Sequence, residues 1–123
     1  MQTTIQPEAV VVPSHAVSEL PTEGLGHLQG VTNRVLWRDH HSLAGVLIIA
    51  AGHQLGPHTH RVNHHHIWFV EGSAVVLGTD LSAGSYVHIP AGVEHDIDAT
   101  TTAGCTVFYL YAHPGPELGA EAS

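Results

Sequence analysis

The chain has 123 residues, enough for one ordinary hydrophobic core and too few for two. It contains three basic residues against eleven acidic ones, and its formal charge is -8 when the histidines are neutral. The length predicts one domain. The negative charge repels phosphate backbones and anionic lipids, so we expect neither nucleic acid nor a membrane surface among the partners.

The N-terminal segment, residues 1–26, contains Pro7, Pro13 and Pro21 among short apolar groups. This pattern predicts an arm or an edge strand and not a helix. The segment lacks the basic and apolar regions of a secretory signal, and no window reaches the ~18 consecutive apolar residues of a membrane span. Cys105 is the only cysteine, which excludes an intramolecular disulfide. These features predict a cytoplasmic protein.

The rest of the chain consists of short β-branched or apolar runs separated by turn residues. Apolar residues never recur at helical spacing for three turns, so the predicted domain is all-β, a sandwich or barrel whose interior can hold a ligand. Breaks are expected at Gly72 and at residues 78–80, 83–84 and 103–104. The predicted strands are residues 31–38, 43–50, 65–71, 73–77, 85–89 and 105–111.

Histidines are concentrated in residues 58–66, which hold five of the thirteen in the chain. His58 and His60 are two residues apart and share one side of an extended strand. The triplet 64–66 alternates in direction, so one or two of its rings can join that pair, but not all three. Imidazole suits zinc, copper, iron and nickel, and the cluster therefore predicts a metal site.

Two spaced motifs in residues 52–99 resemble those of the cupin superfamily. The first is Gly52-x5-His58-x-His60-x4-His65-x6-Gly72, and the second is Gly84-x5-Pro90-x-Gly92-x2-His95-x3-Ala99. Two positions depart from the family pattern: His65 replaces the usual glutamate, and Ala99 replaces an asparagine. The resemblance implies one cupin double-stranded β-helix, a jelly-roll barrel, over residues 27–115, with a tail at 116–123. It also implies that a divalent metal ion is bound by His58, His60, His65 and His95.

The histidine at position 65 has consequences for the metal. Four neutral ligands leave the ion its full charge, so it polarises a bound carbonyl more strongly than a site with a carboxylate would. They also favour zinc, our first choice, with ferrous iron, nickel or copper as alternatives, over manganese or magnesium. If the turn at residues 61–63 differs by one residue, His64 or His66 would take the fourth position instead.

The C-terminal residues 108–119, FYLYAHPGPELG, resemble the ending of small cupin-type cyclases encoded with aromatic polyketide synthases. The histidine-rich first motif is similar to that of the resistomycin-type members. The resemblance implies a metal-dependent polyketide cyclase of antibiotic biosynthesis, which closes and aromatises the rings of a poly-β-keto substrate by aldol condensation. It further implies a homodimer, in which residues 1–26 cover a partner's edge strand, and association with a polyketide synthase.

An aldol condensation needs a group that accepts a proton from the carbon between two carbonyls. The proton could go to a metal-bound hydroxide or to an uncoordinated histidine. The unassigned histidines nearest to the site in sequence are His64, His66 and His88, although His64 and His66 would face away from His65. Among the aromatic residues that could contact the substrate, Tyr109 is preferred over Tyr111. We therefore name His64, His66 and Tyr109 as candidate catalytic residues.

Two other functions compete with cyclisation. A cupin-type dioxygenase would use iron, nickel or copper at the same four histidines to react a phenolic or diketone substrate with oxygen. A non-catalytic metal-sensing or sugar-binding cupin is the third interpretation, but sensing normally requires a second domain or a basic surface, and the sequence has neither.

Overall fold

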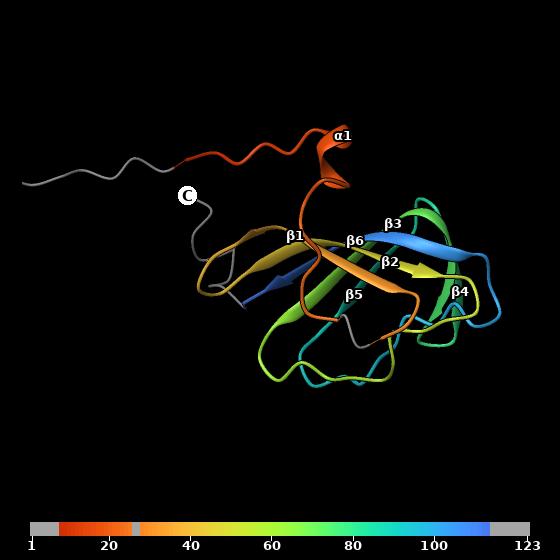
Figure 1. Ribbon diagram of the computed structural model, residues 1–123. Coiled ribbons are helices and arrows are strands. Elements are labelled where there is room, and N and C mark those ends of the chain that lie inside the picture. Colours follow the sequence, from red (N-terminus) through yellow and green to blue (C-terminus); the bar gives the residue numbers. More distant parts are fainter. Residues whose placement is uncertain (1–7, 26–27, 114–123) are drawn as a thin grey trace, which may run out of the picture.

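A computed structural model describes residues 8–25 and 28–113 of the chain. These residues form six antiparallel strands and one short helix (Figure 1). The strand order is β1-β2-β6-β3-β4, and β5 also pairs with β3. The elements are α1 (Ser14–Val17), β1 (Val31–Arg38), β2 (Leu43–Ala50), β3 (His64–Val76), β4 (Thr79–Ser82), β5 (Tyr86–Ile89) and β6 (Gly104–Ala112).

The strands build a curved sheet with an inner and an outer face. Figure 1 shows α1 on one side of this sheet, and the loops that follow β2 and β5 on the other. Isolated bridges join these loops to each other and to β3, which closes the inner side. Buried side chains alternate with more exposed ones along the strands, as one-sided burial requires. The core includes Ile49, Ile67, Ile89, Ile97, Val107 and Phe69.

The first two strands have the predicted bounds, but β3 is longer than expected. It continues through Gly72, where we predicted a break, with an irregular register between Phe69 and Glu71 opposite β6. Gly72 has a φ of 73° and lies so close to the carbonyl of Gly104 that a side chain would collide with it. Glycine here permits the positive φ and the close approach of β6, so the strand continues through Gly72, which pairs with Cys105.

A second correction concerns residues 78–80, predicted as a turn. The turn consists of Leu77 and Gly78, with φ values of 49° and 77°. Val76 pairs with Thr79 on either side of it, and Thr79 begins β4. Positive φ at both central residues is what a two-residue type I′ hairpin requires, and such a turn is short enough for pairing to resume at once.

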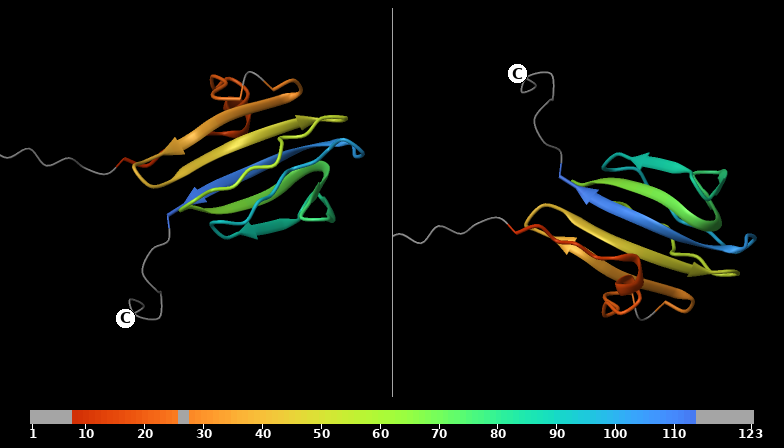
Figure 2. Two further views of the ribbon diagram at one scale, coloured as in Figure 1. Left: turned by 90° about the horizontal axis from the view of Figure 1, so that it is seen from below. Right: turned by 90° about the horizontal axis from the view of Figure 1, so that it is seen from above.

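The N-terminal segment lies along β1 (Figure 2). Thr22 bridges Arg34 in antiparallel fashion, and the Arg34 Nε donates a hydrogen bond to the Leu20 carbonyl at 3.0 Å. The prediction that this segment contains no helix is wrong for one turn, α1, which follows Pro13. Proline is tolerated at a helix start because the first amides have no intrahelical partner. Residues 1–7 and the predicted tail 116–123 lie outside the described residues.

Among the described residues, no helix is long and apolar enough to cross a membrane.

Candidate metal centre

Four histidines from three segments meet on the inner side of the sheet. His65 points inward from β3, and His58 and His60 lie on the loop that follows β2. His95 comes from the loop that follows β5, and its backbone pairs with that of His58 through two hydrogen bonds of 2.9 Å. This pairing joins two loops that are far apart in sequence and fixes the His58 and His95 rings with centroids 4.2 Å apart.

The spacing of the rings fits a single ion. One ligand atom from each of His58, His60, His65 and His95 lies within 4.8 Å of all the others. The Nε2 atoms of His58, His60 and His65 are buried and have no hydrogen-bond partner. Unsatisfied buried polar atoms are costly, and an ion that accepts these lone pairs would remove the cost. The donor set therefore fits a divalent metal.

Backbone carbonyls set the tautomers of two of these rings. The Nδ1 of His58 lies 2.9 Å from the Gly56 oxygen, and the Nδ1 of His95 lies 3.0 Å from the Val93 oxygen. Because a carbonyl oxygen only accepts, Nδ1 carries the proton in both rings and Nε2 keeps its lone pair. Metal-binding histidines commonly have such a partner on the second nitrogen. Asp96 supports this arrangement by accepting a 2.7 Å bond from the Gly56 amide.

The surroundings keep the imidazoles neutral, as ligands must be. Burial, followed by the charges of neighbouring histidines, lowers the pKa of His65 to about 2. The same causes lower the pKa of His60 to about 4. Burial also lowers the pKa of His95, although the bond to the Val93 carbonyl opposes it. At neutral pH these three rings are neutral. The Nε2 atoms of His60 and His65 have no partner, whereas the Nε2 of His95 lies 3.0 Å from the His65 Nδ1 and accepts its hydrogen bond.

The structure separates the histidine triplet by strand alternation. His65 is 1% exposed and contacts the other three inner histidines, whereas His64 and His66 lie on the outer face of β3. Of the three histidines in the triplet, His65 is therefore the one that joins His58, His60 and His95. His64 and His66, named above as catalytic candidates, are not brought to this centre, because adjacent side chains of a strand point to opposite faces.

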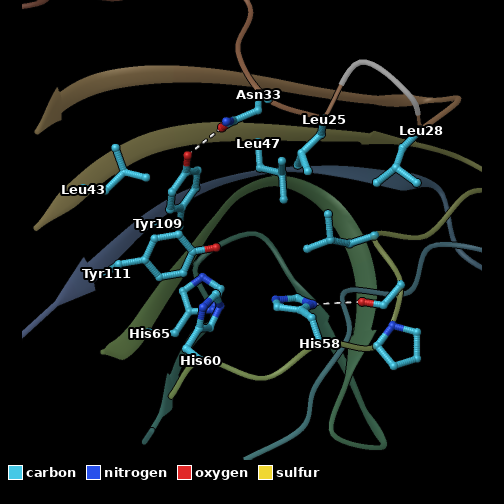
Figure 3. A pocket seen from close by; sticks show the side chains of 14 residues that line it. Leu25, Leu28, Asn33, Leu43, Leu47, His58, His60, His65, Tyr109 and Tyr111 are labelled. Atoms are coloured by element: carbon cyan, nitrogen blue, oxygen red, sulfur yellow. Dashed lines mark hydrogen bonds between the residues drawn. The ribbon is translucent and has the colours of Figure 1, made fainter. Parts of the chain in front are cut away.

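An apolar cavity of about 440 Å³ opens onto the centre (Figure 3). His58, His60 and His65 line one end of it. Tyr109 also lines it, as predicted, and its hydroxyl donates a 2.5 Å hydrogen bond to the Asn33 side chain. The other main lining residues are Leu25, Leu28, Leu43, Leu47, Leu55 and Tyr111.

Tyr111 is the cavity residue that sequence reasoning ranked too low. Its ring centroid lies 4.4 Å from those of both His60 and His65, nearer than that of Tyr109, which is 6.1 Å from His65. Its hydroxyl points into the cavity in Figure 3. The spacing of the two tyrosines could have indicated this position of Tyr111. Tyr109 and Tyr111 are two residues apart on β6 and so share the inner face.

Comparison with known proteins places this fold. No protein-family model matches the sequence, and no curated protein matches it. Many solved structures match the fold, among them an RmlC-like cupin from Shewanella frigidimarina, with a TM-score of 0.68 and 22% identity over 79% of this chain and 86% of that one. A predicted oxalate decarboxylase from Thermotoga maritima has a TM-score of 0.68 and 19% identity over 85% of this chain and 99% of that one. KdgF from Halomonas sp. has a TM-score of 0.63 and 16% identity over 79% of this chain and 92% of that one.

These likenesses show that the chain has an all-β cupin fold, as the two motifs predicted. The four inner histidines coincide with the metal-binding positions that the motifs imply. The fold is that of the cupins, and the group of four histidines could hold a metal ion.

Proposed function

We propose that this protein is a metal-dependent cyclase that closes rings in a poly-β-keto substrate by aldol condensation. The observation that carries the proposal is the direct opening of an apolar cavity, lined by leucines and two tyrosines, onto the group of four inner histidines, three of which line it. The likeness of the C-terminal sequence to cupin-type polyketide cyclases supports it, although residues 114–119 of that stretch lie outside the described structure.

A divalent ion held by His58, His60, His65 and His95 would supply Lewis acidity, which stabilises negative charge as it develops on a carbonyl oxygen. Zinc is our first choice because the reaction needs no redox change and the donor set is all imidazole. The protein's part is to hold three of these nitrogens buried and unpartnered beside an apolar cavity, where electrostatic interactions are stronger than in bulk water.

The leucines position the substrate. A reactive poly-β-keto chain folds in several ways in water, and an apolar wall selects one of them by bringing the reacting carbons together. Leu43 and Leu47 of β2 and Leu55 of the following loop form part of this wall. Their side chains offer no polar group that could react with the ketones.

We assign to Tyr111 the role of hydrogen-bond donor to an oxygen of the substrate. Burial, followed by the charge of Tyr109, raises the pKa of Tyr111, so its hydroxyl stays protonated at neutral pH. A protonated hydroxyl that points into the cavity can donate a hydrogen bond to an enolate or keto oxygen. Tyr109 is already bonded to Asn33, and its role is to shape the wall.

A dioxygenase is the second candidate, and the donor set itself favours it, because four imidazoles also suit iron, copper and nickel. Pairing with a second copy of the chain and docking to a polyketide synthase stay predictions.

Product mass and oxygen uptake distinguish the two candidates. The metal-loaded protein is incubated with a synthetic poly-β-ketone with and without oxygen, and the products are analysed by mass spectrometry. Cyclisation predicts the loss of one water for each aromatic ring closed, at equal rates in both atmospheres. Products that gain two oxygen atoms, formed only in air, would establish the dioxygenase and overturn the cyclase.

A further inference from the structure

Strand β3 presents histidines to both faces of the sheet. While His65 points to the inner centre, His64 and His66 point outward, and β5 places His88 opposite His66 in the antiparallel register. The motif His64-x-His66 has the same two-residue spacing as His58-x-His60, which puts two imidazoles on one side of an extended strand. The outer face thus gathers three histidines of its own.

The three rings are in contact. The Nδ1 of His64 lies 2.7 Å from the Nε2 of His88, and the two rings are nearly parallel, with centroids 5.0 Å apart and planes at 11°. The His66 ring also stacks on His88, with their centroids 5.0 Å apart. Two ring nitrogens at this distance share one proton, and a metal ion can replace that proton, because it binds the same lone pairs.

A tyrosine sets the orientation of the third ring. The Nδ1 of His66 lies 2.6 Å from the Tyr86 hydroxyl oxygen. When Nδ1 carries the proton and donates to this oxygen, Nε2 is left as a free ligand atom. A metal-binding histidine normally has such a partner on its second nitrogen, and here Tyr86 takes the place that backbone carbonyls take at the inner centre.

We propose that His64, His66 and His88 form a second metal site, on the outer face of the sheet, for zinc, nickel or copper. Zinc binds imidazole nitrogen at ~2.0–2.1 Å, so the His64 and His88 nitrogens must separate slightly to admit it. The rings can turn because His88 is exposed and the other two are half-buried. Solvent or a donor from another molecule completes the coordination.

This outer site binds more weakly than the inner one. Its rings are stacked and do not converge, so binding requires them to turn, whereas the inner ligand atoms already lie together and are buried. Preorganisation of this kind increases affinity. The inference does not depend on the cyclase, because it concerns only metal binding on the opposite face.

Zinc titration of the full-length, metal-stripped protein tests the proposal. In competition with a chelator, the wild type should bind one tight and one weaker equivalent. His88→Gln should lose the weaker equivalent and keep the tight one, which also shows that the variant is folded. His15→Gln, at an exposed histidine of α1, should keep both equivalents. A single equivalent in the wild type, or two in His88→Gln, overturns the proposal.

Nuclear magnetic resonance of the wild type provides a test without a variant. Imidazole nitrogen signals move when a nitrogen binds zinc in place of a proton. The second equivalent of zinc should shift the ring signals of His64, His66 and His88 and leave that of His15 in place. If the second equivalent instead shifts scattered histidines, including His15, binding is adventitious and the outer site does not exist.

Discussion

The two faces of β3 place the same kind of residue in opposite circumstances. On the inner face, His65 is buried with three other histidines, and its Nε2 has no partner. On the outer face, His64 and His66 stack with His88 and Tyr86 beside solvent. The comparison shows that a histidine-rich sequence does not define a site: one residue of strand phase decides between a buried metal ligand and a surface ring.

The largest difference between the two faces is expected in the metal affinity of variants that lack one histidine. His65→Ala removes a buried ligand, and we expect its affinity for the tight ion to fall by more than ~100-fold, since altering even an outer-shell partner costs 10–100-fold. His64→Ala, one residue away on the other face, should keep the tight ion. Chelator competition measures both, and full retention of metal by His65→Ala would refute the assignment of His65.

The next effect concerns turnover. Tyr111→Phe keeps the ring against His60 and His65 but removes the hydroxyl, so we expect a rate about 10²-fold lower with metal affinity unchanged. Phe108→Leu, on the outer face of the same strand, is the matched control and should retain the rate. Single-turnover kinetics on a poly-β-ketone decides the point, and equal rates for Tyr111→Phe and wild type would remove Tyr111 from the reaction.

A smaller effect is expected when the ligand is exchanged and not deleted. His65→Glu should still bind zinc, but its carboxylate partly neutralises the ion, so turnover should fall by less than in the variant without the ligand. His64→Glu adds the same charge to the outer face and serves as the control for a general electrostatic effect. Unchanged turnover in His65→Glu would argue against the Lewis-acid role.

The smallest effect is the pH dependence of stability in the metal-free protein. The pKa values of His60 and His65, about 4 and about 2, lie below the 6.5 of an unperturbed histidine. The unfolded chain therefore binds more protons below pH 6.5, and the free energy of unfolding should fall as the pH drops from 6.5 towards 4, and further towards 2 for His65. In the variant His65→Leu, which lacks this titrating group, the free energy of unfolding should fall less steeply as the pH drops. Urea denaturation at a series of pH values measures it, and equal declines would contradict the prediction.

The sequence predicted the parts of this molecule that depend on local pattern. The bounds of β1 and β2 follow from apolar runs between turns, and the two motifs predicted the group of four histidines, although these come from three separate segments. Alternation along the triplet showed that all three rings could not share one face, but the register that selects His65 depends on pairing with β5 and β6.

The remaining features depend on contacts that no local pattern records. Gly72 resembles a strand break, and only its pairing with Cys105 and its close approach to the Gly104 carbonyl show that the strand continues through it. The closeness of Tyr111 to His60 results from where a loop crosses β6. The stacking of His88 on His66 likewise requires two strands to pair in one register.

Elemental analysis of protein purified without an affinity tag and dialysed exhaustively tests the central claim most directly. We expect one zinc ion to be retained for each chain, since of the inner and outer centres the inner one alone is buried and preorganised. Retention of no stoichiometric metal would contradict a metal centre at the four histidines. Iron, copper or nickel at full occupancy would instead contradict redox-free cyclisation and favour the dioxygenase.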